Sequence, residues 1–295
     1  MSTVNKAGLE DVVVSTSGIC FIDGHEGRLV YRGYDIDDLV EHSSFEEVVY
    51  LLWYGALPTR KELGGHWKAL AATANRRLPP KLVTILRSLP KKTTPMEILR
   101  TGVSALSAFD PDAGDNSREA TVRKAIRLTA QMPTLVAVWE RVRRGKAPIA
   151  PNPKLSLAAN FLYMMSGKKP TDLATKTFDV ALILHADHEF NASTFAARVT
   201  AATLSDLHSA VVAAIGALKG PLHGGANEQV MLMVEQIGSP ARAEGWIRKA
   251  LADKARVMGF GHRVYRVEDP RAKHLRRLAA ELGRQTGNTS SVQIL

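Results

Sequence analysis

The sequence predicts a mainly α-helical protein with short β segments only at its N-terminus. Helix-capping residues precede amphipathic stretches from residue 44 onward, whereas strand-like runs separated by glycine turns are confined to the first 34 residues. The chain has 295 residues, of which 45% are apolar, so it can bury one large core or two domains of unequal size. This apolar content argues against wholesale disorder.

The N-terminal residues alternate between short apolar runs and glycine turns. VVVSTSGICFI is followed by Asp23 and Gly24, then by Glu26 and Gly27, and then by RLVYRGY. This pattern is typical of brief β strands joined by tight turns. We therefore expect strands here, and helices in the rest of the chain.

Three capping sequences open the first predicted helices. Ser44 to Glu47 is a capping box ahead of apolar positions, and Gly55 ends that helix. Thr59 to Glu62 opens a second helix, and Thr94 to Glu97 opens a third, with proline at the tolerated first helical position.

A long amphipathic pattern over residues 117–142 predicts a helix with a kink at Pro133. The clearest loop follows at residues 146–154, where three of nine residues are proline. Further helices are expected near 155–166, 171–186, 192–203, 206–219, 226–237, 240–253 and 270–285.

Composition narrows the cellular setting. No stretch reaches the roughly 18 uninterrupted apolar residues that a membrane helix needs, and the N-terminus lacks the pattern of a secretory signal. A single cysteine, Cys20, excludes an internal disulfide framework and any CxxC motif. We therefore expect a cytoplasmic protein with no membrane partner.

The formal net charge of +10 makes polyanionic partners worth considering. The densest basic groups are Arg141 to Lys146 and Arg271 to Arg277, and both are also explained by solvated helix surfaces. Because the basic residues are otherwise spread out, we do not expect nucleic acid as a partner. A small anion that carries phosphates, such as CoA, fits the charge equally well.

The first candidate site segment is HADHEFN, which contains His185 and His188 after an apolar helix. Histidines three apart share a helical face, so a metal pair is one interpretation. However, HADHE does not have the HExxH order of zinc peptidases, and no third ligand is evident. The alternatives are a structural histidine bonded to helix-end carbonyls and an anion-binding group, and the motifs that follow favour anion binding.

The second segment is KGPLHGGANE, in which His223 lies between glycines on a turn. Such a histidine is poorly placed to fill a core, and glycines let a ligand approach the backbone closely. A helix that begins near Ala226 would point its N-terminal amides toward an anion. These features favour a functional histidine.

The third segment is GFGHRVYRVEDPR, in which His262 follows a GxG turn. GxG alone is weak evidence for phosphate binding, but two arginines accompany it. Asp269 and Pro270 cap the next helix and place Arg271 in its first turn. Arginine can bind a carboxylate through two hydrogen bonds. The start of a helix favours acidic residues, so a basic residue there is mildly unfavourable for the helix itself. Arg271 is therefore a candidate ligand-binding residue.

These motifs resemble those of the citrate synthase family, in the shorter bacterial and archaeal form that includes 2-methylcitrate synthases. The similarity covers nearly the whole chain, from GYDIDDLVEHSSFEEVVYLLWYGALPT through HADHEFNASTFAARV and GPLHGGANEQVM to GFGHRVYRVEDPRAKHL. It implies condensation of acetyl-CoA with oxaloacetate, followed by hydrolysis of citryl-CoA to citrate and CoA. It also implies a multi-helical fold with a large domain and a smaller mobile one, which we place at residues 1–225 and 226–295.

The resemblance implies a role for each motif residue. His223 would hydrogen-bond the thioester oxygen and stabilise the enol or enolate, and His262 would donate to the oxo-acid carbonyl. His188 and Arg271 would bind the oxo-acid carboxylates. The CoA-binding residues would be Arg256, Val257, Met258, Gly259, Phe260, Gly261 and Arg266.

The resemblance further implies a homodimer and no cofactor other than the CoA thioester, which is a substrate. It also implies a catalytic aspartate in a motif like NVDFYSG, and no such motif occurs in residues 1–295. We therefore expect the chain to be part of a longer enzyme, or a truncated product with little activity. A 2-methylcitrate synthase that uses propionyl-CoA, and an inactive protein that binds CoA or a dicarboxylate, are the alternatives.

Overall fold

A computed structural model describes residues 15–261 and 264–294 and has the predicted mainly α architecture. The short strands lie at the N-terminal end of the described chain. They are β1 (Cys20–Asp23), β2 (Arg28–Tyr31) and β3 (Tyr34–Asp35). They form one antiparallel sheet in the order β1-β2-β3, with Cys20 opposite Tyr31 and Val30 opposite Asp35. The expected VVV strand falls at positions outside the described residues.

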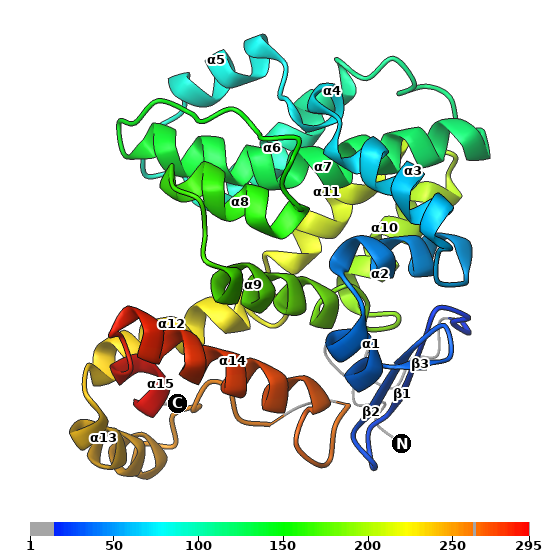
Figure 1. Ribbon diagram of the computed structural model, residues 1–295. Coiled ribbons are helices and arrows are strands. Elements are labelled where there is room, and N and C mark those ends of the chain that lie inside the picture. Colours follow the sequence, from blue (N-terminus) through cyan, green and yellow to red (C-terminus); the bar gives the residue numbers. More distant parts are fainter. Residues whose placement is uncertain (1–14, 262–263, 295) are drawn as a thin grey trace, which may run out of the picture.

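The helices follow the sheet in an unbroken series (Figure 1). The first group is α1 (Ile36–His42), α2 (Phe45–Tyr54), α3 (Arg60–Ala71), α4 (Thr73–Arg76), α5 (Pro80–Ser88), α6 (Pro95–Ser107), α7 (Arg118–Arg143) and α8 (Leu157–Ser166). The second group is α9 (Asp172–Leu184), α10 (Ala192–Ala202), α11 (Leu207–Leu218), α12 (Ala226–Ile237), α13 (Pro240–Ala252), α14 (Pro270–Thr286) and α15 (Ser290–Ile294).

The helix starts follow the predicted caps. Ser44 accepts a hydrogen bond from the amide of Glu47, and Glu47 accepts one from the amide of Ser44 at 2.7 Å. The same reciprocal arrangement opens α3 and α6. Gly55 ends α2 with a φ of 91°, a conformation that favours glycine. The local capping signals therefore place these helices correctly.

Four described helices lack a side-chain cap, namely α4, α5, α12 and α13. Of these, the sequence predicted α12 and α13 but not α4 or α5. α7 covers the range over which a long helix was predicted, and it continues as one helix through Pro133. None of the described helices is both long enough and apolar enough to cross a membrane.

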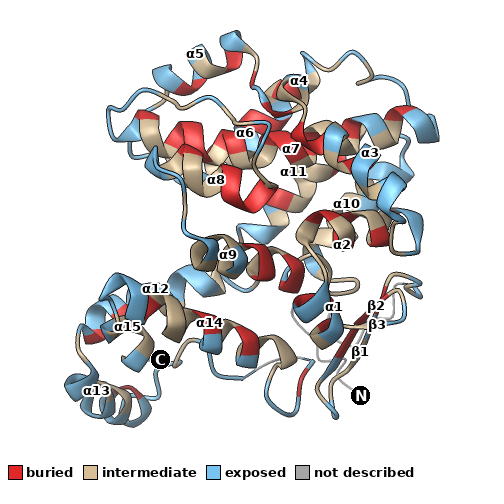
Figure 2. Ribbon diagram, viewed as in Figure 1, coloured by how far each residue is buried: buried red, intermediate tan, exposed pale blue. Residues whose placement is uncertain are grey.

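Much of the buried core lies in two hydrophobic clusters (Figure 2). One lies among α5, α6, α7 and α11 and contains the buried Trp139. The other joins the sheet to α1, α2, α9 and α14 through residues such as Tyr31, Leu184 and Leu278. This second cluster brings α14, far along the sequence, beside α9 and the N-terminal sheet, as Figure 1 shows. It therefore positions the candidate site.

Candidate functional site

Residues 185–193, which are the loop after α9 and the first two residues of α10, contact both of the other candidate segments. The Nε2 atom of His188 lies 3.2 Å from the hydroxyl of Tyr265, which belongs to the third segment. Five residues further on, the Oγ atom of Ser193 lies 2.9 Å from the Nε2 atom of His223, which belongs to the second. The fold thus brings together three segments that are far apart in the sequence.

A buried tyrosine fixes the start of segment 185–193. The hydroxyl of Tyr31 lies 3.0 Å from the carbonyl oxygen of Asp187 and 3.2 Å from that of Ile183, and it accepts from the amide of Asp187 at 3.3 Å. Burial raises the pKa of Tyr31, so the hydroxyl keeps its proton and remains a donor. The sheet therefore sets the position from which His188 projects.

The β1 strand holds the next residue. The carboxylate of Glu189 accepts from the amide of Ile22 at 3.2 Å, and Glu189 has a φ of 57°, a conformation that is uncommon for a residue other than glycine. A tight turn immediately after His188 is thus stabilised from the sheet. Such locally costly backbone persists only where surrounding contacts hold it.

His185 has a different environment from His188. Its Nδ1 atom lies 2.6 Å from the carbonyl oxygen of Ala181 in the last turn of α9. This is the structural interpretation of a histidine near a helix end. The two histidines of HADHE therefore have separate protein partners, and among the described residues no group of three or more potential ligands could hold a metal ion.

His223 lies on the turn between α11 and α12. A Cβ atom at Gly224 would lie 2.5 Å from Leu218 Cδ1, and one at Gly225 would lie 3.1 Å from the carbonyl oxygen of Gly220. The packing of the turn itself therefore explains why these two positions are glycine. From the sequence we had expected the glycines to let a ligand approach. As predicted, α12 begins at Ala226, and no side chain caps its first amides.

Burial lowers the pKa of His223, which favours the neutral imidazole. Its partner Ser193 has one hydroxyl proton and a second neighbour, the Oδ1 atom of Asn191 at 2.6 Å. If Ser193 donates to Nε2 of His223, the imidazole carries its proton on Nδ1 and can donate it to a ligand. If Ser193 donates to Asn191 instead, Nε2 carries the proton. The serine therefore controls the tautomer of His223.

The third segment has a left-handed backbone conformation at both glycines of its GxG turn. Gly259 and Gly261 have φ values of 90° and 81°, which side-chain-bearing residues rarely adopt. Arg256 and Phe260 are exposed, Val257 and Met258 are half-buried, and Arg266 is exposed. His262 lies outside the described residues.

The turn of the β1–β2 hairpin clamps the part of this segment that follows His262. The amide of Arg266 donates to the carbonyl oxygen of Gly24 at 2.7 Å. A Cβ atom at Gly24 would lie 2.2 Å from the carbonyl oxygen of Val264, and one at Gly27 would lie 2.9 Å from Val267 Cγ2. The hairpin can approach this closely because both turn positions are glycine.

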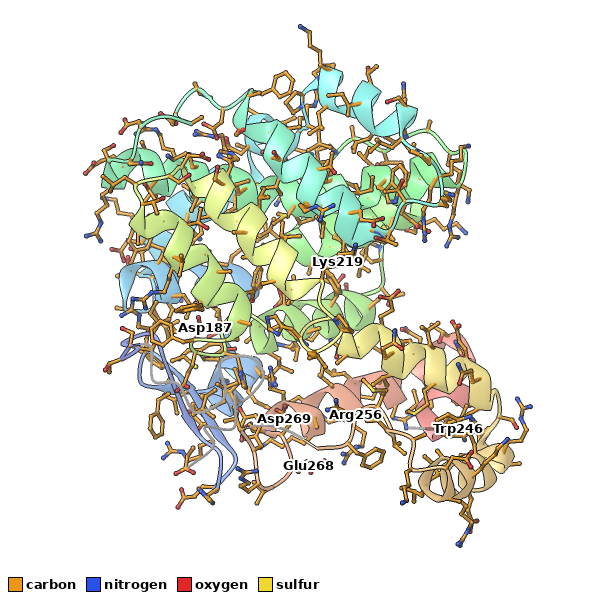
Figure 3. The ribbon with its side chains drawn as sticks, turned by 180° about the vertical axis from the view of Figure 1, so that it is seen from behind. Asp187, Lys219, Trp246, Arg256, Glu268 and Asp269 are labelled. Carbon is orange, nitrogen blue, oxygen red and sulfur yellow. The ribbon has the colours of Figure 1, made fainter. Side chains whose placement is uncertain are left out.

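Arg271 lies in the first turn of α14, as predicted, and is held by the residue that caps that helix. Its Nε and Nη2 atoms donate to the two carboxylate oxygens of Asp269 at 2.9 and 2.6 Å. Burial opposes the charge of Arg271, but the paired carboxylate more than offsets this and raises its pKa. Figure 3 places Asp187 at the junction of the upper and lower helices, with Asp269 below it.

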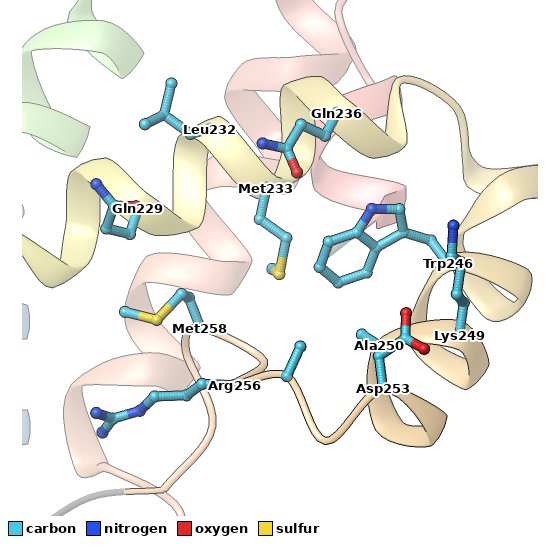
Figure 4. A pocket seen from close by; sticks show the side chains of 11 residues that line it. Gln229, Leu232, Met233, Gln236, Trp246, Lys249, Ala250, Asp253, Arg256 and Met258 are labelled. Carbon is cyan, nitrogen blue, oxygen red and sulfur yellow. The ribbon is translucent and has the colours of Figure 1, made fainter.

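A separate cavity of about 380 Å³ lies between α12, α13 and residues 253–258 (Figure 4). Trp246 and Met233 point into it, whereas the side chain of Arg256 extends away from Trp246. Met258 also lines it. The cavity is thus next to the segment expected to bind CoA, but neither His188 nor His223 lines it.

The structure adds residues that the sequence interpretation did not identify as part of the site. They are Ser193, which contacts His223, Tyr265, which contacts His188, and Asp269, which pairs with Arg271 as well as capping α14. Ser193 and Tyr265 lie inside the recognised motifs, and no spacing rule pairs them with histidines 30 and 77 residues away.

Comparison with known proteins identifies close relatives. A family described as "Citrate synthase, C-terminal domain" matches residues 8–295. "Citrate synthase 2" of Bacillus subtilis is 49% identical over 283 residues, which are 96% of this chain and 75% of that protein. "2-methylcitrate synthase" of Mycobacterium tuberculosis H37Rv is 47% identical over 278 residues, 94% of this chain and 70% of that protein.

Solved structures are also similar. Citrate synthase from Pyrobaculum aerophilum has a TM-score of 0.87 at 44% identity and covers 95% of this chain and 71% of its own. The Thermoplasma acidophilum citrate synthase, in a ternary complex with carboxymethyl coenzyme A and oxaloacetate, has a TM-score of 0.90 at 34% identity. That match covers 97% of this chain and 75% of the archaeal one.

Proposed function

We propose residue roles for this chain, which belongs to the citrate synthase family. It is an acyltransferase that condenses acetyl-CoA with oxaloacetate to give citrate and CoA. The observation that carries the proposal is that segment 185–193 contacts both the His223 turn and the segment that contains Arg271. Groups suited to a thioester and groups suited to a dicarboxylate are therefore held by the same segment.

His223 acts on the thioester. Its imidazole is favoured as neutral. Ser193 donates its hydroxyl proton to Asn191 in the structure, and when this hydroxyl turns to donate to Nε2 instead, the ring presents an Nδ1–H donor. A fixed donor stabilises the negative charge that develops on the thioester oxygen while a carboxylate base, of the kind that the resemblance implies, takes the methyl proton. It stabilises this state more than the ground state. The uncapped amides at the start of α12 add a favourable field for negative charge.

His188, Arg271 and His262 act on oxaloacetate. The guanidinium of Arg271 binds a carboxylate by sharing or replacing its present contact with Asp269, and His188 binds a second carboxylate oxygen. His262 donates to the oxo carbonyl, which makes that carbon a better electrophile. The segment that follows His262 is fixed by the Gly24 turn, which supports this placement.

The backbone from Val257 to Gly261 binds the adenine end of CoA, and Arg256 and Arg266 lie near its phosphates. The left-handed glycines and the exposure of both arginines support this assignment. The reaction uses no cofactor, since imidazole and guanidinium donors supply the polarisation of both carbonyls. Residues 1–225 form the large domain and residues 226–295 the small one. A cytoplasmic location is supported by the single cysteine.

The acyl group is tested by comparing thiol release from acetyl-CoA and from propionyl-CoA, each with oxaloacetate. We expect the higher kcat/KM with acetyl-CoA. A clear preference for propionyl-CoA would assign the chain to the 2-methylcitrate synthases, which are also among its relatives. Oxaloacetate binding by calorimetry without any thiol release would instead support the non-catalytic binding protein.

The protein assembles as a homodimer through α10. This helix, ASTFAARVTAA, is rich in small and apolar residues, yet none of its residues is buried. Val199 is 50% exposed, and Leu204, just beyond the helix, is 81% exposed. Contiguous exposed apolar side chains mark an interaction surface, and small residues let two helices approach closely.

Light scattering should give twice the chain mass of 32.1 kDa. Val199→Asp places a charge on this surface and should shift the mass toward that of the monomer, whereas Leu251→Asp on α13, at a position 62% exposed, should leave it unchanged. A monomeric parent protein, or a Val199→Asp variant that stays dimeric, would rule out this interface.

A further inference from the structure

We propose that Tyr265 is a positioning residue for His188. Its hydroxyl fixes the orientation and the tautomer of the imidazole, so that the ring always presents an Nδ1–H donor to the oxo-acid carboxylate. This inference rests on the carboxylate-binding role proposed for His188, and it adds a residue to which the motifs assign no role.

The contact joins two segments that are 77 residues apart. The Tyr265 hydroxyl lies 3.2 Å from Nε2 of His188, and the two rings meet edge to face with centroids 5.6 Å apart and an interplanar angle of 69°. Tyr265 is only 3% exposed. A buried hydroxyl requires a hydrogen-bond partner, and here the imidazole provides one.

The phenol keeps its proton at neutral pH. Burial raises the pKa of Tyr265, and the nearby Asp269 raises it further, which outweighs the opposing effect of Arg271. A neutral hydroxyl can either donate or accept one hydrogen bond with the ring. It is therefore compatible with both charge states of His188.

The consequence for the imidazole follows from counting protons. When His188 is neutral and the phenol donates to Nε2, the ring proton is on Nδ1. When His188 is charged, Nε2–H donates to the phenol oxygen, and Nδ1 again carries a proton. With phenylalanine at position 265, a neutral His188 could hold its proton on Nε2 and offer only a lone pair at Nδ1.

Tyr265 is itself held firmly. It lies between Val264 and Arg266, which contact the Gly24 turn, and it precedes the Asp269–Arg271 pair. Several described titratable groups surround the His188–Tyr265 contact. They are Cys20 on β1, Tyr31 on β2, Asp187 and Glu189 beside His188, and Asp269 and Arg271 at the start of α14.

The test measures oxaloacetate binding by calorimetry from pH 6 to 8.5 in the parent protein and in Tyr265→Phe. Loss of one hydrogen bond, typically about 1 kcal/mol, should raise the Kd about 5-fold at pH 7. The loss should be larger at pH 8.5 than at pH 6, because only a neutral imidazole needs the hydroxyl to select its tautomer. Tyr34→Phe, at a tyrosine that is 39% exposed on β3, is the matched control and should change neither quantity.

A double-mutant cycle separates this inference from the role of His188. His188→Ala should weaken oxaloacetate binding, and adding Tyr265→Phe should then have no further effect. If His188→Ala leaves the Kd unchanged, the proposed role of His188 is wrong. If His188→Ala weakens binding but Tyr265→Phe alters neither the Kd nor its pH dependence, only the positioning role is wrong.

NMR of labelled histidine provides a readout independent of affinity. We expect neutral His188 to be the Nδ1–H tautomer in the parent protein and a mixture of tautomers in Tyr265→Phe. The same tautomer in both proteins would overturn the proposal. Because phenylalanine keeps the ring and its packing, the variant should retain the thermal midpoint of the parent to within a few degrees.

Discussion

Replacing His223 with alanine is expected to lower the turnover number about 10²- to 10³-fold, the usual effect of removing one oxyanion donor. His223 combines a position on a glycine turn, a pKa lowered by burial and a serine that can set its tautomer. The lost interaction is strongest in the transition state, so kcat should fall far more than the affinity for acetyl-CoA. Steady-state thiol release at saturating substrates measures the effect.

Two variants make this result specific. Ser193→Ala keeps the imidazole but removes the hydroxyl that selects its tautomer, so turnover should fall by a smaller factor of about 10. His185→Ala removes an exposed histidine that bonds only the carbonyl of Ala181 among the described contacts, and it should leave kcat within about 2-fold. A folded His223→Ala variant with an unchanged kcat would exclude His223 from the chemistry.

Local sequence signals predicted the helix starts well because capping involves residues only three positions apart. Ser44 with Glu47, Thr59 with Glu62, and Asp269 before Pro270 all cap helices where expected. α5 has no such pair, and the local signal at its start is the proline in its first turn, Pro80. Where the chain itself supplies both partners within one turn, the sequence is sufficient.

The site was predicted less completely, because its contacts join distant segments. The motifs point to His188, His223 and Arg271 as candidates. The fold is needed to show that the hydroxyls of Ser193 and Tyr265 contact two of these residues. The glycines beside His223 show the same limit. A glycine run is compatible with ligand approach and with tight packing, and only the position of Leu218 distinguishes the two.

Arg76 on α4 is a fully buried arginine, and we expect its side chain to contribute strongly to the stability of the fold. Its guanidinium donates to the carbonyl oxygens of Leu70, Asn152 and Leu155 at 2.8 to 2.9 Å. Burial lowers the pKa of Arg76, and the nearby carboxylate of Glu46 offsets this effect in part. Glu46 also accepts from the amide of Leu157 at 2.8 Å. Together these two side chains fasten the proline-rich loop and the start of α8 to α2 and α3.

Arg76→Ala should lower the free energy of unfolding by about 3–5 kcal/mol, because it leaves three carbonyls without their donor and the buried carboxylate of Glu46 without its nearby positive charge. Urea denaturation followed by circular dichroism measures this change. Arg77→Ala, at the adjacent exposed arginine, is the control and should cost at most about 0.5 kcal/mol.

A second substitution tests whether the buried charge is the cause. Glu46→Gln keeps an acceptor for the amide of Leu157 but removes the carboxylate charge, so it should recover part of the stability lost in Arg76→Ala. Oxaloacetate affinity should remain that of the parent in each folded variant, since none of these residues contacts the candidate site. An Arg76→Ala variant as stable as Arg77→Ala would show that surrounding water replaces the guanidinium, and the assigned anchoring role would then be wrong.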